Sequence, residues 1–278
     1  IGLADVAEKR AATAESVYAI GSITKSFTAL ATLQLVERGK LSLDDTVGKW
    51  LPDYQGPARD VTIAHLLDHT SGIPNYTDNR PLYPRLERNG WTREEMVANF
   101  SSLPLQFTPG ARWSYSIAVD VQALLVEAIS GQKFADYVRQ QIFEPLKMKD
   151  TAWRQPDDRL PRFASLYRVK DGQLTRDSDE AARRINFQNN RLTGGGFGLA
   201  STLDDYLRFA RMLLNKGELD GQRILKPSTV ELMSTDHLDP KMTDRGFLPG
   251  KGSVGFGFDF AVRVSQPKDA KESRGAVG

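Results

Sequence analysis

Ser22 and Lys25 lie three residues apart at the start of an apolar segment, a spacing that suits nucleophilic catalysis. Residues three apart lie on one face of a helix, so the lysine amine can reach the serine hydroxyl. A serine is a weak nucleophile until a base takes its proton, and a lysine serves only where burial and nearby positive potential lower its pKa. The N-terminal end of a buried helix supplies both conditions. The pattern by itself fits equally well a serine cap followed by a solvated lysine.

Tyr115 is a second residue able to move protons, in a turn that begins at Pro109-Gly110 and leads into a helix expected from Ala118. A tyrosine close to a lysine ammonium can be stabilised as a phenolate, or can pass its proton through the lysine, and so act as a general base. The other interpretation is a buried aromatic residue with a satisfied hydroxyl. We therefore predict Ser22 as nucleophile, Lys25 in proton transfer and Tyr115 as general base.

The elements that position these residues are predicted from apolar spacing and helix stop signals. Helical spacing runs from Ser22 to Arg38, and Gly39 stands where a helix stop is expected. Thr202 is predicted to cap a helix that ends near Asn215. Further helices are expected at 63–68, 93–100, 118–130 and 134–143, and a strand at 255–262, where apolar residues alternate.

Composition excludes several classes of partner. The chain has 278 residues, 40% of them hydrophobic and 26% charged, with 37 basic against 35 acidic side chains. The net charge of +2 gives no reason to expect a nucleic acid or an anionic membrane surface. No segment approaches the roughly 20 apolar residues of a membrane span. A small molecule is the expected partner, while oligomeric state and compartment are not predicted.

Other chemical signals are weaker. His65 and His69 are four apart, but no glutamate lies between them and no third ligand is evident, so we predict no metal site. The glycine run 194–198 lacks the Lys-Ser/Thr ending of a phosphate loop and is predicted to form a tight turn. No Gly-x-Ser-x-Gly occurs, which argues against an α/β-hydrolase esterase.

The order of the motifs resembles that of class C β-lactamase-like proteins, over nearly the whole chain. This family contains β-lactamases, D-alanyl-D-alanine peptidases and the family VIII carboxylesterases, which act through an acyl-enzyme on the serine of Ser-x-x-Lys. The matching segments are Ser-x-x-Lys at 22–25, Gly-Lys-Leu-Ser-Leu-Asp-Asp at 39–45, Leu-Leu-Asp-His-Thr-Ser-Gly-Ile at 66–73, Pro-Gly to Tyr-Ser at 109–116, Glu-Pro-Leu-Lys-Met at 144–148, and the stretch from Gly-Gly-Gly to Asp-Tyr at 194–206.

The resemblance implies an α/β (α+β) fold of the β-lactamase/transpeptidase type. An antiparallel sheet flanked by helices would comprise residues 1–45 and 190–278, and a mostly helical domain would comprise 46–189. The site would lie at their junction, with Gly195 and Gly196 on the substrate side. The oxyanion hole would use the backbone N–H of Ser22 and a second N–H from the strand that carries the family's third motif. No cofactor or metal would be required.

The chain departs from the family pattern at two places. Tyr115-Ser116-Ile117 stands where β-lactamases and peptidases carry Tyr-x-Asn, which is more like the family VIII esterases. An apolar Ile117 in the substrate site suits a small ester that has no amide to bind. The third motif is not found, because Lys251-Gly252-Ser253 is a poor substitute, so we expect an incomplete sheet in a chain truncated at both ends. The alternatives are a β-lactamase or D-alanyl-D-alanine carboxypeptidase acting on a β-lactam-like substrate, and a non-catalytic ligand-binding homologue.

Overall fold

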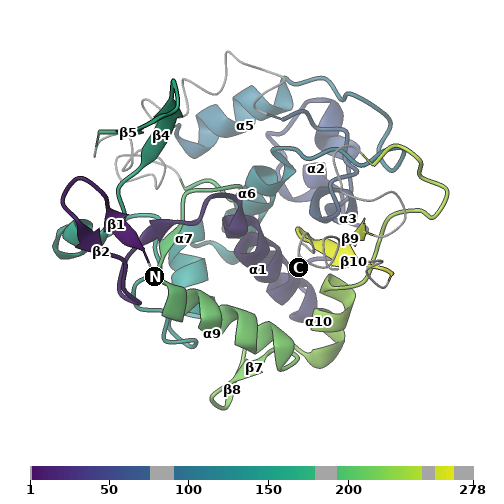
Figure 1. The fold of residues 1–278 in the computed structure, drawn as a ribbon. Helices are drawn as coiled ribbons and strands as arrows, with labels where there is room; N and C mark the ends of the chain where they lie inside the picture. Colours follow the sequence, from purple (N-terminus) through teal and green to yellow (C-terminus); the bar gives the residue numbers. More distant parts are fainter. Residues whose placement is uncertain (1, 76–90, 179–192, 246–253, 266–278) are drawn as a thin grey trace.

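Helix α1 (Thr24–Glu37) lies at the centre of the molecule, with other helices packed around it (Figure 1). The computed structural model describes residues 2–75, 91–178, 193–245 and 254–265. A 3-10 turn, Gly21–Ile23, leads into α1, and the chain leaves it through Gly39 in the left-handed conformation, with φ 66°. Apolar residues occupy every side of α1, so the helix is buried along most of its length. The predicted helix from Ser22 to Arg38 is confirmed.

The helices between residues 44 and 178 form one side of the molecule. They are α2 (Val47–Trp50), α3 (Ile63–Leu67), α5 (Arg93–Ser101), α6 (Ala118–Ser130) and α7 (Phe134–Val138), which continues as a π-helical turn, Arg139–Phe143. A short 3-10 turn, Pro57–Asp60, lies between α2 and α3, and a second, Asp157–Arg162, follows the π-helical turn and precedes β4. Gly131 ends α6 with φ 71°, the helix stop that the sequence predicts.

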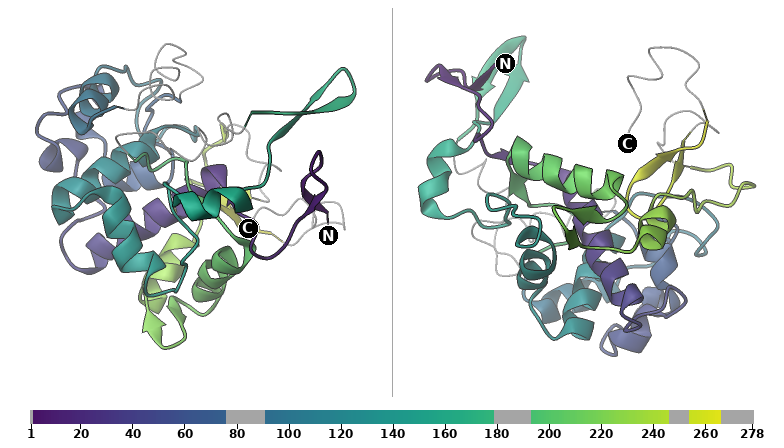
Figure 2. Two further views of the ribbon diagram at one scale, coloured as in Figure 1. Left: turned by 90° about the vertical axis from the view of Figure 1, so that its left-hand side faces the viewer. Right: turned by 90° about the horizontal axis from the view of Figure 1, so that it is seen from below.

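The described strands are short and pair in antiparallel twos. The pairs are β1 (Leu3–Asp5) with β2 (Arg10–Ala11), β3 (Tyr18–Ala19) with β6 (Ala200–Ser201), β4 (Tyr167–Lys170) with β5 (Gln173–Arg176), β7 (Glu218–Leu219) with β8 (Gln222–Arg223), and β9 (Val254–Phe256) with β10 (Ala261–Arg263). In Figure 2 the β4–β5 hairpin and the β1–β2 pair project from the body on the same side. The β3–β6 pair joins the chain before Ser22 to the chain after the glycine run.

The single strand predicted at 255–262 is wrong, because the segment is a hairpin. β9 ends at Phe256, Ala261 pairs with it, and Gly257 N–H donates to Phe260 C=O at 3.0 Å. Asp259 adopts φ 61° in the turn. Apolar alternation continues through a tight hairpin as it does along one strand, so the pattern cannot separate the two. The turn directs the Asp259 side chain into the interior, where it becomes part of the site described below.

Two C-terminal helices, α9 (Leu203–Leu214) and α10 (Pro227–Met233), complete the packing around α1. Thr202 caps α9 as predicted, accepting from Asp205 N–H at 3.3 Å. Phe27 on α1 packs against Phe209 on α9 with ring centroids 4.0 Å apart. An apolar groove of about 720 Å³ lies between α9 and α10. In the described part of the chain, no helix is long and apolar enough to cross a membrane.

Candidate active site

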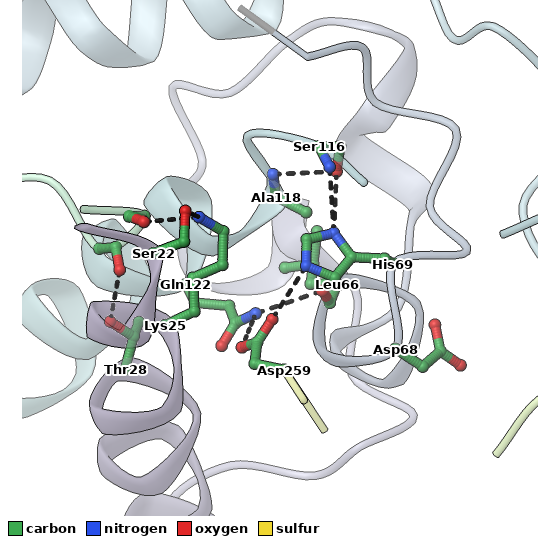
Figure 3. A network of polar contacts seen from close by, with 12 residues as sticks. Ser22, Lys25, Thr28, Leu66, Asp68, His69, Ser116, Ala118, Gln122 and Asp259 are labelled. Carbon is green, nitrogen blue, oxygen red and sulfur yellow. Dashed lines mark hydrogen bonds and ion pairs between the residues drawn. The ribbon is translucent and has the colours of Figure 1, made fainter. Parts of the chain in front are cut away.

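Ser22 and Lys25 are in contact at the entrance to α1. The Ser22 side chain is exposed on the 3-10 turn, whereas Lys25 is only 7% exposed. Lys25 Nζ donates to Ser22 Oγ at 3.3 Å and to the Gly196 carbonyl at 2.5 Å (Figure 3). A lysine that is buried and bonded in this way is not the solvated residue of the alternative interpretation. The serine thus presents its hydroxyl to solvent, and the amine lies beneath it.

Tyr115 lies against the same amine. Lys25 Nζ lies 4.6 Å from the centroid of the Tyr115 ring, a cation–π distance. The tyrosine belongs to the segment that leads into α6, ninety residues after the lysine in the chain. The structure therefore brings Ser22, Lys25 and Tyr115 together, and their catalytic roles are taken up as a proposal below.

The glycine run after residue 193 packs tightly against this group. Gly196 N–H donates to the buried Asp120 carboxylate at 3.1 Å, and its carbonyl accepts from Lys25. A methyl group on Gly195 would lie 2.3 Å from the Val119 carbonyl oxygen, so only glycine fits this close approach. The contacts described for both glycines go to protein groups, and their predicted role in substrate binding stays a prediction.

Ile117 is 2% exposed and packs into the main hydrophobic core. It stands at the N-cap position of α6, two residues after Tyr115. Its side chain offers little surface to a ligand in this conformation, so a contact with substrate stays a prediction.

The sequence prediction missed a buried polar network centred on His69, whose ring stacks on that of Tyr115. Figure 3 shows this network. His69 Nδ1 accepts from Ser116 N–H at 3.1 Å. Its Nε2 lies 3.3 Å from Asp259 Oδ1, which is close enough for an ion pair. The two atoms are not aligned well enough for a hydrogen bond. Gln122 Nε2 donates to the other oxygen, Asp259 Oδ2, at 2.9 Å. Burial is the main influence on Asp259 and raises the pKa of its carboxyl, while the contacts with His69 and Gln122 oppose that rise.

The spacing of His65 and His69 does not translate into a shared helix face. Helix α3 ends at Leu67, and His69 follows it in the left-handed conformation with φ 60°. Among the described residues, no group of three His, Cys, Asp or Glu side chains is placed to hold a metal ion. The signal that points to the network is Asp259, an acidic residue inside an otherwise apolar alternating segment.

Asp68, next to His69, gives a prediction about stability. Burial, its largest influence, raises the pKa of its carboxyl to about 6 from the ordinary 3.8, and the charge of Asp259 adds to the rise, although Thr70 donates to it. The folded protein therefore binds more protons than the unfolded chain between these values, and this carboxyl lowers stability as the pH rises through that window. The shift corresponds to about 3 kcal/mol.

We expect Asp68→Asn to remove this pH-dependent loss, because the amide stays neutral and its oxygen can still accept from Thr70. Urea unfolding of both proteins at pH 4 and pH 7 measures it. The change in unfolding free energy between the two pH values should differ between wild type and variant by about 2–3 kcal/mol, in favour of the variant at pH 7. Equal pH dependence in the two proteins would show that Asp68 titrates normally.

Comparison with known proteins relates this arrangement to others. The Beta-lactamase family model matches residues 1–276. Esterase EstB of Burkholderia gladioli is 32% identical over 234 residues, which cover 74% of this chain and 59% of that protein. An uncharacterized protein of Mycobacterium tuberculosis is 33% identical over 284 residues, 95% of this chain and 70% of its own length. The chain thus spans 59% to 70% of the length of these curated relatives.

Solved structures with the same fold include a hydrolase and a penicillin-binding protein homologue. EstCE1, described as a hydrolase with promiscuous acyltransferase activity, superposes with a TM-score of 0.80 at 25% identity over 98% of this chain and 75% of that chain. The octameric penicillin-binding protein homologue from Pyrococcus abyssi gives 0.73 at 27% identity over 94% of this chain and 56% of that chain. The predicted β-lactamase/transpeptidase-like fold is therefore confirmed. Because the family model spans nearly all of the chain and the neighbouring structures share its fold, the protein belongs to the β-lactamase family of penicillin-binding-protein-like serine hydrolases.

Proposed function

We propose that this protein is a serine carboxylesterase that hydrolyses small esters through an acyl-enzyme on Ser22. The observation that carries the proposal is the buried Lys25 amine, which contacts Ser22 Oγ at 3.3 Å and lies 4.6 Å from the Tyr115 ring centroid. Nucleophile, cation and potential base are then within one contact shell. The family is one of hydrolases with esterase members, which agrees with this chemistry.

The proposed reaction has two halves. In acylation Ser22 Oγ attacks the ester carbonyl carbon while its proton passes to the Tyr115 phenolate, which the Lys25 ammonium stabilises. The tetrahedral oxyanion is bound by the Ser22 backbone N–H. The intermediate collapses, and the alcohol leaves with the proton held by Tyr115. In deacylation a water gives its proton to Tyr115 and attacks the acyl carbon, and the acid leaves as Ser22 regains its hydroxyl hydrogen.

We further propose that the site joins the two domains expected from the sequence. Ser22 and Lys25 come from the segment 1–45, Tyr115 from 46–189, and Gly196 from 190–278. The contacts of Lys25 with Ser22, Tyr115 and Gly196 support a site at the junction of these segments.

Ile117 favours esters over β-lactams in this proposal. An asparagine at this position can hydrogen-bond the amide of a β-lactam or peptide side chain, whereas isoleucine leaves such an amide unpaired. A buried unpaired polar group costs about 1–3 kcal/mol, or roughly tenfold to more than a hundredfold in discrimination. Lovastatin esterase of Penicillium rubens, 29% identical over 259 residues, is a second relative named for ester hydrolysis. Penicillin-binding protein 4* of Bacillus subtilis is 33% identical over 177 residues, and its name supports the alternative of a β-lactam-like substrate.

The test compares kcat/KM for p-nitrophenyl butyrate and for a chromogenic cephalosporin. We expect the ester to be preferred by at least about tenfold, because Ile117 offers no hydrogen bond to the amide of a cephalosporin. A preference for the cephalosporin would overturn the esterase assignment in favour of a β-lactamase. Turnover of neither substrate, together with no covalent labelling by a fluorophosphonate, would identify a non-catalytic homologue.

A further inference from the structure

His69 contacts the segment that carries Tyr115 through both its backbone and its ring. The His69 carbonyl accepts from Ser114 N–H at 2.9 Å, and Nδ1 accepts from Ser116 N–H at 3.1 Å. Between these two bonds the imidazole stacks on the Tyr115 ring, with centroids 5.0 Å apart and planes 20° from parallel. Lys25 Nζ also approaches the Tyr115 ring. The tyrosine is therefore in contact with both an imidazole and an ammonium.

The Nε2 edge of the imidazole is linked to α1 through Asp259 and Gln122. Asp259 lies 3.3 Å from Nε2, and Gln122 Nε2 donates to Asp259 and to the Leu66 carbonyl. The Gln122 side-chain oxygen accepts from Thr32 Oγ1 on α1 at 3.4 Å. The side chains of His69, Asp259 and Gln122 are buried, so water has little access to them. The helix that holds Lys25 is thus connected, through the buried side chains of Thr32, Gln122, Asp259 and His69, to the segment that holds Tyr115. Figure 3 shows the part of this network from Gln122 to Ser116.

The hydrogen bonds select one form of the imidazole. Since Nδ1 accepts from a backbone N–H, it carries no hydrogen, and the ring hydrogen of neutral His69 belongs on Nε2, facing the Asp259 carboxylate. The other tautomer would set an N–H against the Ser116 N–H, and a flipped ring would set a C–H there, so neither could accept this hydrogen bond. The ring plane is thereby fixed, and with it the face on which Tyr115 stacks.

We propose that His69 is a positioning residue whose imidazole, fixed between Ser116 and Asp259, holds the Tyr115 ring against Lys25. The proposal rests on the proposed function. The charged or titratable groups around the imidazole are Asp259 at its edge, Asp68 before it in the chain and Lys25 across the Tyr115 ring. His69 touches no reacting atom in this scheme, so its loss should lower kcat and leave KM nearly unchanged.

The test uses His69→Asn and Asp259→Asn, with His65→Asn as the matched control. The asparagine at 69 keeps an acceptor near Ser116 N–H but removes the stacked ring and the contact with Asp259. A misplacement of a catalytic group by about 1 Å can cost about a hundredfold in rate, so we expect kcat for p-nitrophenyl butyrate to fall about 10- to 100-fold. The acidic limb of the kcat/KM profile should move to higher pH, because a phenolate further from an ammonium is less stabilised.

Asp259→Asn separates positioning from stability. Burial disfavours the charged carboxylate, so the neutral amide should leave the melting temperature unchanged or higher. It should nevertheless lower kcat, because an asparagine can turn its NH₂ toward His69 and favour the other tautomer. A purely structural role would move activity and stability in the same direction. The control, His65→Asn, changes a histidine on α3 whose Nδ1 has no hydrogen-bond partner among the residues that the structure describes. Both kinetic constants should stay within about twofold of wild type.

Labelling distinguishes a failure of this proposal from a failure of the esterase assignment. The rate of fluorophosphonate labelling of Ser22 depends on the base and needs no ester turnover, so it is measured on every variant. Slower labelling and lower kcat in folded Asp259→Asn support the proposal, even where His69→Asn does not fold. Wild-type kcat, labelling rate and pH profile in folded Asp259→Asn would overturn it. A wild type that is labelled but turns over no ester would overturn the esterase assignment alone.

Discussion

Ser22→Ala is expected to abolish ester hydrolysis, with kcat falling by about 10⁴- to 10⁶-fold, the range seen when a covalent nucleophile is removed. The Ser22 side chain is exposed, and its described side-chain contact is the one with Lys25. The fold should therefore remain, with stability changed by less than about 1 kcal/mol. Steady-state rates with p-nitrophenyl butyrate and a thermal melt measure the two quantities.

The matched control is Ser26→Ala, one helical turn along α1. Ser26 lines the groove between α9 and α10, so its loss should leave turnover unchanged. A fluorophosphonate should add to one serine of wild type and of the control, located at Ser22 by peptide mass analysis, and should not add to Ser22→Ala. If Ser22→Ala kept more than a hundredth of wild-type kcat, another group would be the nucleophile.

Lys25→Met is expected to lower kcat by about 10²- to 10⁴-fold, the usual contribution of a proton-transfer residue, with KM changed by less than about threefold. Methionine matches the length of the lysine stem and fits the buried position, so the protein should fold. The variant loses the contacts with Ser22 and Gly196 and the charge beside Tyr115. Arginine should not restore activity, because its planar, always protonated guanidinium is larger than an amine.

Lys49→Met is the matched control, since Lys49 is an exposed lysine on α2 that pairs with Asp45 at the surface. Its kcat should equal that of wild type. A Lys25→Met variant that retained a tenth of wild-type kcat would exclude the lysine from proton transfer and leave Tyr115 to act without it.

The sequence predicts the parts of the site that depend on local signals. The spacing of Ser22 and Lys25 and the apolar character of the following segment specify a buried helix start, which the structure has. The C-terminal end of α6 follows from Gly131, and the cap of α9 from Thr202. Each of these signals acts within a few residues, so one sequence is enough to read it.

The network behind Tyr115 could not be predicted in the same way. His69 and Asp259 are brought together by a hairpin whose alternation looks like one strand, and the contact exists only in three dimensions. The four-residue spacing of His65 and His69 likewise says nothing about the role of His69, because α3 ends at Leu67, before the second histidine. Lys251-Gly252-Ser253 lies outside the described residues, so the expected loss of the third motif stays a prediction.

The contacts between the start of α1 and the glycine run join parts of the chain that lie far apart in the sequence. Lys25 and Gly196 are 171 positions apart in the chain, and Thr28 and Gly195 are 167 apart. Closing such loops costs chain entropy that local helix formation does not have to overcome, so these contacts form slowly compared with helices. A collapsed chain with all its helices formed would still lack a working site. Enzymatic activity therefore reports the correct topology of this protein, whereas its helix content does not.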